Sequence, residues 1–370
     1  MRIRPIFCAG LLLLCCTSGC SKVEHNSTLD AVIQQTEAVA TATKSVTSVS
    51  TASETAQTTV TVKQTETADI PTTDDVPPIV LNQGGGYLLT GDAFDINDYV
   101  GFGDDYDDKP KLSYTGTVDV NTPGAYTLTA TAEDASGNTT SWELTVTVVD
   151  EIPEEPDNAP RIAFDDFAAQ YGGAGKSLGI DVSKWQGDID FQAVKDAGCS
   201  FVIMRIGSDY DEIAMDSTYQ QNMAAAKAAG LQVGVYFYST GNSEEKIRAE
   251  ANWIAAQLDG QPLDFPVAFD WESFSNYQKY EMSIHKLNQL YEIFREELAA
   301  QGYDTMLYSS KNFLYNFWYG HEDSPTWLAH YTDETDYTGD YAIWQMSSRG
   351  RIDGIAGDVD LNILYMDKLS

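Results

Sequence analysis

The feature that most constrains this chain is a regular alternation of strand-like and helix-like segments from residue 177 to the C-terminus. Eight short apolar segments indicate strands, and a helix-length segment follows each of the first five. Two helix-length segments, 217–229 and 283–301, end at Gly230 and Gly302, and glycine is the residue that most often ends a helix. The expected strands are 178–183, 201–206, 233–238, 267–272, 305–309, 326–331, 341–346 and 358–363.

The connections set the expected architecture. Strands alternating with helices favour a sheet that closes into a barrel. The last three strands are joined by only about ten residues, which is too few for a helix with its two loops. We therefore predict an α/β fold, a barrel with five helices around it and one side closed by strands alone.

The first twenty residues resemble a secretory signal. Two arginines precede an apolar run, 6–14, which is too short to span a bilayer as a helix, and small residues lead to Cys20. This ending resembles the lipobox of bacterial lipoproteins, except that Thr17 stands where a leucine is usual. We expect residues 1–20 to be a lipoprotein signal peptide and Cys20 to become a lipidated N-terminus. Only Cys199 then remains, so an intradomain disulfide is excluded.

Three further segments precede the barrel. Residues 21–75 are rich in Thr, Ser and Ala without an aromatic residue, and predict a disordered tether. Residues 76–150 alternate in short stretches between turns and predict a small antiparallel β-sandwich, which resembles bacterial immunoglobulin-like repeats and is expected to act as a spacer or weak wall binder. Within it, the acidic stretch 103–108 lacks the spacing of a calcium loop and is expected to be a solvated turn. Residues 151–176 begin rich in Pro and acid and are expected to be a linker to the barrel, 177–370.

The charge balance excludes one class of partner. The chain carries 56 acidic against 22 basic residues, for a net charge of -34, whereas nucleic-acid binding needs clustered Lys and Arg. The four His residues are scattered without the spacing of metal ligands. We expect no nucleic acid, no metal and no cofactor, and a monomer.

Two carboxylates lie at the end of the fourth expected strand. In residues 266–272, alternation turns Val267 and its odd-numbered neighbours toward the helices and turns Asp270 and Glu272 into the barrel. Their Cα atoms are expected to be roughly 6.5 Å apart, at the C-terminal end of a barrel strand, where active sites form. Two buried carboxylates this close repel each other, so that one is expected to hold a proton near neutral pH. Glycosidic bond hydrolysis needs this combination of a proton donor and an anion, and the spacing does not separate retention from inversion.

Two further acids converge on the same place. Asp181 points inward near the end of the first expected strand, and Asp360 does so on the last. A lone inward acid is ordinarily a salt-bridged or capping residue. Four acids at one barrel mouth are costly to bury, and such a cluster indicates a functional site.

Four segments of the chain resemble a known family. The segments 179–187 (GIDVSKWQG), 268–272 (AFDWE), 344–345 (WQ) and 350–362 (GRIDGIAGDVDLN) are similar, in this order, to glycoside hydrolase family 25, the lysozymes of the cellosyl and phage-endolysin type. The resemblance covers about residues 177–365. It implies an irregular TIM-like (β/α)5(β)3 barrel and cleavage of the β-1,4 bond after N-acetylmuramic acid in peptidoglycan.

The resemblance also assigns roles. It implies that Glu272 is the general acid that protonates the leaving glycosidic oxygen. Asp270 is then expected to orient the substrate acetamido group, whose carbonyl serves as internal nucleophile, or else to stabilise the oxocarbenium ion directly; we favour the substrate-assisted version. Asp181 and Asp360 fit the family's further site acids, which tune the pair and hold substrate hydroxyls.

Aromatic rings are expected to line the sugar groove, since they stack on the apolar faces of pyranoses. Each candidate is as well explained by a place in the core. In the third expected strand the run is Tyr-Phe-Tyr where the family often carries Tyr-His-Phe, which affects substrate binding rather than the chemistry. The candidate substrate-binding residues are Tyr236, Tyr238, Tyr308, Trp327, Tyr331 and Gln345.

The sequence thus favours a lysozyme on the extracellular face of the bacterial membrane, held by a lipid on Cys20, or a secreted one, with glycan strands as its partner. A glycosidase acting on another polymer would keep the acid pair and change the groove. The alternatives without catalysis are a surface lipoprotein that binds carbohydrate and a barrel that only scaffolds partners. The intact Asp270 and Glu272 argue against the first of these, and wall binding without hydrolysis would favour the second.

Overall fold

The computed structural model gives a partial description of the chain. The predicted signal peptide, Cys20 and nearly all of the tether lie outside the described residues. Among the residues described, no helix combines the length and apolarity needed to cross a membrane. The described ranges are 74–82, 84–153, 159–210, 212–272, 277–320 and 323–369.

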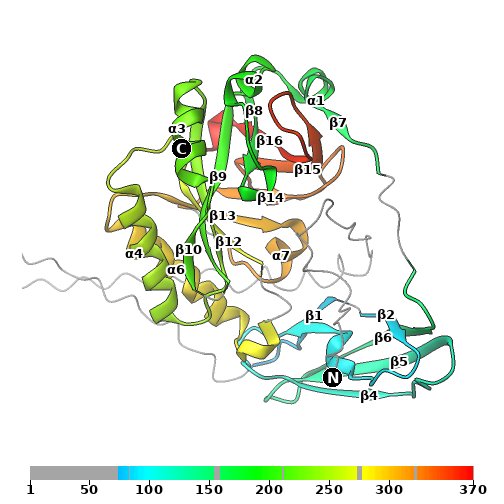
Figure 1. Cartoon of the computed structure of the whole chain (residues 1–370). Helices are drawn as coiled ribbons and strands as arrows, with labels where there is room; N and C mark the ends of the chain where they lie inside the picture. The colour runs from blue at the N-terminus through cyan, green and yellow to red at the C-terminus, as the bar shows by residue number, and fades with distance from the viewer. Residues whose placement is uncertain are drawn as a thin grey trace, which may run out of the picture. The chain divides into compact units, whose positions relative to one another are not determined.

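In the described part of the chain, eight strands close into a barrel, as predicted (Figure 1). The sheet closes because the first barrel strand is hydrogen-bonded both to the second and to the last. The last strand is antiparallel to both of its neighbours, and the other adjacent pairs of the barrel are parallel. Around the barrel the strands are β8 (Lys176–Val182), β9 (Phe201–Asp209), β11 (Gln232–Ser239), β12 (Val267–Trp271), β13 (Thr305–Ser310), β14 (Thr326–Ala329), β15 (Ile343–Arg351) and β16 (Val359–Tyr365), with β10 (Ile213–Met215) paired to β9.

Helices follow the first five barrel strands. The two predicted helix ends hold, because Gly230 and Gly302 have φ of 75° and 86°, a backbone conformation that favours glycine. The described residues between β14 and β15, and between β15 and β16, contain no helix, as the short connections predicted. The helices are α2 (Phe191–Asp196), α3 (Tyr219–Ala228), α4 (Glu244–Leu258), α6 (Ile284–Ala299) and α7 (Lys311–Asn316). Within the expected linker, 151–176, the chain forms β7 (Ile162–Ala163) and α1 (Phe164–Tyr171).

The barrel wall separates two apolar layers. Even-numbered residues of β12 such as Ala268 pack inside the barrel, and Phe269 packs outside under the helices, as the alternation predicted. The interior is tight: a Cβ on Gly179 would lie 2.5 Å from the ring of Phe201, so only glycine fits beside that side chain. The inner layer fills the barrel below its mouth, which leaves the strand ends as the place for polar side chains.

The segment preceding the barrel is a β domain, as predicted. A four-stranded sheet has the order β2-β6-β5-β4, and β1 pairs with β3 in a second, two-stranded sheet. The pairing departs from the purely antiparallel prediction because β2 runs parallel to β6. Leu128 and Val146 lie in its core. The strands are β1 (Ile79–Asn82), β2 (Gly86–Leu89), β3 (Gly101–Gly103), β4 (Lys111–Thr115), β5 (Gly124–Glu133) and β6 (Thr139–Val149).

The acidic stretch 103–108 is not the solvated turn that was expected. Asp104 is fully buried, and its Oδ1 accepts hydrogen bonds from the backbone N–H groups of Tyr106 and Asp107, at 3.1 and 2.7 Å. Asp108 Oδ1 accepts from the backbone N–H of Ser283, the residue before α6, at 2.8 Å. The expectation failed because the first N–H groups of a helix need acceptors, and this stretch supplies three, for the N–H groups of residues 283–285.

Candidate active site

Four acids meet at one end of the barrel. Asp270 lies near the end of β12 and is 4% exposed, and Glu272 follows the strand and is half-buried. Asp181, 6% exposed near the end of β8, stands in register with the partly exposed Asp360 of β16. Because β16 runs antiparallel to β8, its start lies at the same end of the barrel as the ends of the parallel strands. All four predicted acids therefore come together.

The carboxyl groups of Asp181, Asp270 and Glu272 resist ionisation. Burial raises the pKa of Asp270 well above its ordinary value, and the charge of Glu272 raises it further. Burial also raises the pKa of Glu272, and it raises that of Asp181 to about 6. Asp270 Oδ1 is buried without a hydrogen-bond partner among the described residues. Asp270 and Glu272 therefore keep a proton between them to a higher pH than isolated carboxyl groups do.

Amides and rings beneath the mouth hold Asp181 in place. Gln345 Nε2 and Asn362 Nδ2 both donate to Asp181 Oδ2, at 2.9 and 2.7 Å. Tyr308 donates its hydroxyl to Gln345 Oε1 at 2.9 Å, and Trp327 Nε1 donates to Asn362 Oδ1 at 2.8 Å. The two amide donors, Gln345 and Asn362, stabilise the carboxylate of Asp181 and oppose the effect of its burial.

Three of the residues predicted to bind sugar are therefore in the barrel wall. Gln345 and Trp327 are 3% and 1% exposed, and Tyr308 is 9% exposed with its ring 4.8 Å from that of Trp327. Tyr331 is 43% exposed and also donates to Gln345 Oε1, at 2.9 Å, so it links the surface to the buried amides. Tyr236 is half-buried and its ring meets that of Trp327 edge to face.

Exposed rings stand on the other side of the mouth. Tyr238 stacks on Tyr210 with ring centroids 4.8 Å apart, and Tyr210 is 50% exposed. Trp185 is 51% exposed, four residues after Asp181, and Lys184 Nζ lies 5.0 Å from its ring centroid. Sequence reasoning missed Trp185 and Tyr210. The quoted segment 179–187 already contained the tryptophan, while Tyr210 lies in a turn that strand alternation does not orient.

A buried cation also escaped the sequence analysis. Arg205 of β9 is 5% exposed and forms an ion pair with Asp216, with 2.7 Å between Nη2 and Oδ2. Burial raises the pKa of Asp216. Its hydrogen bonds and the charge of Arg205 lower that pKa by more, so the net shift is a decrease. The charge of Arg205 also lowers the pKa of Asp270, against the effect of burial. Arg205 lies four residues after Phe201, which packs inside the barrel, so strand alternation turns both side chains inward. This alternation was the signal that could have identified Arg205.

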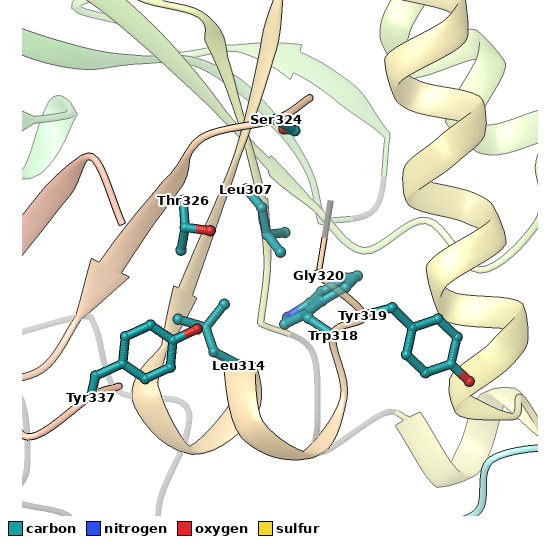
Figure 2. Close-up of a pocket in the computed structure, with 8 residues that line it drawn as sticks. All are labelled: Leu307, Leu314, Trp318, Tyr319, Gly320, Ser324, Thr326 and Tyr337. Carbon is teal, nitrogen blue, oxygen red and sulfur yellow. The ribbon is translucent and has the colours of Figure 1, made fainter. Parts of the chain in front are cut away.

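Two cavities differ in their relation to the acids. One, of about 290 Å³, is lined by Arg205, Tyr210, Lys184 and other polar residues of the β9–β10 side. The other, of about 80 Å³, is lined by Leu307, Trp318 and the neighbours labelled in Figure 2, and none of its lining residues is acidic. None of the four acids lines either cavity, but the first contains Arg205, whose charge lowers the pKa of Asp270.

A closed β/α barrel with paired acids at its strand ends is an architecture of glycoside hydrolases. Two family models match this chain: residues 180–355 match glycosyl hydrolases family 25, and residues 83–148 match the Ig-like domain of bacterial surface proteins. The chain therefore carries a family 25 glycosyl hydrolase domain preceded by a bacterial surface Ig-like domain.

Relatives of this chain include proteins named as lysozymes. It is 31% identical over 188 residues to an autolytic lysozyme of Clostridium acetobutylicum, covering 50% of this chain and 54% of that protein. It is 31% identical over 199 residues to Lysozyme M1 of Streptomyces globisporus, covering 50% of this chain and 66% of that protein. A crystal structure of a bacterial lysozyme from Streptomyces coelicolor aligns at 26% identity with a TM-score of 0.44, covering 50% of this chain and 90% of that one. The match thus spans about half the length of the Clostridium protein.

Proposed function

We propose that this protein is a lysozyme, an N-acetylmuramidase that hydrolyses the β-1,4 bond between N-acetylmuramic acid and N-acetylglucosamine in peptidoglycan. The observation that carries the proposal is the pair Asp270 and Glu272, whose pKa values are both raised, at the mouth of a family 25 domain. Two relatives of the chain, from Clostridium acetobutylicum and Streptomyces globisporus, bear the name lysozyme. We also infer that the barrel layout is of the (β/α)5(β)3 type, which the helix-free connections of β14, β15 and β16 support.

Glu272 is the proposed general acid. It is the more exposed member of the pair, so a glycosidic oxygen can approach it, while its raised pKa keeps a proton available near neutral pH. In the first step this proton moves to the leaving oxygen as the bond from that oxygen to the anomeric carbon breaks. Glu272 is left as a carboxylate, able to take a proton from the incoming water in the second step.

Asp270 is the proposed partner of the substrate acetamido group. A donated N–H from that group would favour the ionised form of Asp270 and move the shared proton to Glu272. The acetamido carbonyl oxygen then attacks the anomeric carbon as the leaving oxygen departs, and water later opens the resulting ring. The unpartnered, buried Oδ1 of Asp270 is a suitable acceptor for that N–H.

Asp181 and Asp360 are proposed to tune this pair and to hold substrate hydroxyls. The charge of Asp181 raises the pKa of Asp270, which helps the pair to retain its proton. We propose that the exposed rings of Trp185, Tyr210 and Tyr331 stack on the sugars, with Tyr236 and Tyr238 beside them. Tyr308, Trp327 and Gln345 then act beneath the groove.

The proposed place of action is the cell wall. We propose that a lipid on Cys20 holds a monomer on the extracellular face of the membrane, with glycan strands as its partner; secretion without the lipid is the alternative. Mass analysis of the mature protein from membrane and medium fractions tests this. Recovery wholly from the medium without lipid would overturn the anchor.

The experiment that tests the activity is mass analysis of the reducing ends released from purified peptidoglycan, with Glu272→Gln alongside. Muramic acid reducing ends from the native chain, and loss of release in the variant, would support both the bond and the acid. Glucosamine ends would contradict the bond assignment. Wall binding without release would favour a carbohydrate-binding surface protein, and release from another polymer alone would favour a different glycosidase.

A further inference from the structure

A second buried carboxyl group lies outside the candidate active site. Glu250 of α4 has no exposed surface, and its Oε2 accepts a hydrogen bond from Ser239 Oγ at 2.7 Å. Its Oε1 is buried, and the carboxyl group shares a hydrogen bond with the side chain of Asp209 on β9. Burying an ionised acid costs folding free energy, and the cost falls when the acid is neutral and hydrogen-bonded. A fully buried acid on a surface helix therefore needs an explanation.

Glu250 lies against the turn that ends β11. Ser239 Oγ, which donates to Glu250, also accepts from the backbone N–H of Gly241 at 3.1 Å. Position 241 admits only glycine here, because a Cβ would lie 2.7 Å from Glu250 Oε1 and 2.5 Å from Ile247 Cδ1. The carboxyl group therefore binds Ser239 at one end of this three-residue turn, 239–241, and lies against Gly241 at the other.

The same turn is hydrogen-bonded to β12, the strand that carries Asp270. The indole Nε1 of Trp271 donates to the carbonyl oxygen of Gly241 at 2.8 Å, and Ser239 stands in register with Trp271 across β11 and β12. Trp271 is fully buried and separates Asp270 from Glu272 in the chain. A continuous set of hydrogen bonds thus runs from Glu250 through the turn to the residue between the two proposed catalytic acids.

The surroundings of Glu250 favour its neutral form. Burial raises its pKa to about 8, and the charge of Asp209 on β9 adds to the increase. The hydrogen bond from Ser239 and the charge of Lys246 on α4 lower it by less. Ionisation would remove the proton that the two carboxyl groups share and would leave Glu250 and Asp209 to repel each other where both are buried.

We propose that Glu250, as a neutral carboxylic acid, is a positioning residue for β12, and that repulsion between its ionised form and Asp209 moves it away from the 239–241 turn and so releases Trp271. This role rests on the proposed function of Asp270 and Glu272. Glu250 itself does not face the mouth of the barrel and does not touch the substrate.

The first test compares the pH dependence of kcat in the full chain and in three variants. In Glu250→Gln the amide has the shape and neutrality of the protonated acid, so kcat near pH 6 stays within about threefold of the native value. Glu250→Ala removes the acceptor for Ser239 and lowers kcat roughly tenfold to 10²-fold with KM little changed, as a displaced catalytic group would. The matched control Glu245→Gln, on the exposed face of the same helix, changes neither.

The shape of the alkaline limb separates positioning from simple packing. Loss of the Glu272 proton alone gives a slope of about -1 in log kcat against pH, and a second inactivating ionisation steepens it to about -2. We expect the native chain to steepen above pH about 8 and Glu250→Gln to keep the shallower slope. Equal slopes in the two proteins, or a Glu250→Gln variant as slow as Glu250→Ala near pH 6, would overturn the proposal.

The second test does not depend on hydrolysis. Exchange of the Trp271 indole proton is followed by NMR, with Trp271→Phe identifying the signal, and compared between proteins at equal pH. We expect protection in Glu250→Gln at every pH, loss of protection in the native chain above about pH 8, and little protection in Glu250→Ala. Equal protection in all three would overturn the anchoring role. This exchange pattern in a chain without hydrolytic activity would contradict the proposed lysozyme function and leave the anchoring role of Glu250 supported.

Discussion

Two acid pairs lie on opposite sides of the same barrel wall, and the difference between them is one of access. Asp270 and Glu272 project into the mouth, where Glu272 is half-buried, whereas Asp209 and Glu250 lie under α4, where Glu250 has no exposed surface. In both places burial raises the pKa of a carboxyl group. A raised pKa is therefore not enough to identify a catalytic acid.

The surroundings decide what the raised pKa does. At the mouth Glu272 is partly exposed and exposed rings lie nearby, so that under the proposed function a retained proton can be given to a substrate. Under α4 the retained proton has no substrate to reach, and it serves to keep a buried oxygen neutral beside Ser239 and Gly241. The first arrangement is suited to proton transfer, and the second is suited to holding a turn in position.

The largest expected effect contrasts the two pairs directly. Glu272→Gln removes the proton donor and lowers kcat by about 10²- to 10⁴-fold, while Glu250→Gln near pH 6 leaves it almost unchanged. Both substitutions exchange a carboxyl group for an amide of the same size, so packing is matched. Initial rates on purified peptidoglycan measure the contrast, and a similar loss in both variants would remove the distinction.

Asp270→Asn is expected to lower kcat roughly 10²-fold, because the amide cannot replace the charge beside the developing cation. The stability of this variant, in contrast to its kcat, is expected to exceed that of the native chain as pH rises. The pKa of Asp270 in the folded chain is raised, so the native chain loses stability as pH rises above the unfolded value of 3.8, and the asparagine variant does not. Thermal unfolding between pH 4 and pH 8 should show a Tm advantage that grows with pH; a constant difference would contradict the shift.

Asp181→Asn sharpens the description of the mouth. The charge of Asp181 raises the pKa of Asp270, so its removal should move the alkaline limb of kcat to lower pH by a fraction of a unit. The pKa of Asp181 is itself raised to about 6, so the stability that the native chain loses between about pH 4 and pH 6 should be retained in the variant. The pH profile of kcat, together with Tm across this range, measures both effects. An alkaline limb that moves to higher pH would contradict the stated coupling.

The smallest expected effect is on substrate binding. Trp185→Ala should raise KM about 2- to 10-fold with little change in kcat, since an aromatic contact is worth about 0.5–1.5 kcal/mol. The matched control is Tyr87→Ala, which removes a 39% exposed ring from the Ig-like domain. Steady-state kinetics on soluble glycan fragments compare the two, and an unchanged KM in Trp185→Ala would remove this ring from the proposed groove.

Much of the barrel could be predicted because its signals are local. The period of two along β12 placed Asp270 inside the barrel and Phe269 outside, and the short connections after β14 predicted the side without helices. The glycines at 230 and 302 marked helix ends through their backbone freedom. Alternation also turned Asp181 and Asp360 inward, but only the antiparallel direction of β16 brings Asp360 to the same end as Asp181.

The sequence by itself determined which residues face inward, whereas only the tertiary structure decided how deep each one lies and what it contacts. Trp327 and Gln345 have the right parity for a groove, yet the packing of neighbouring strands buries them under Tyr308 and Asp181. Glu250 reaches Ser239 because of the way α4 rests on β11. Alternation is a property of one strand, and burial depends on segments that are far apart in the chain and meet only in the folded barrel.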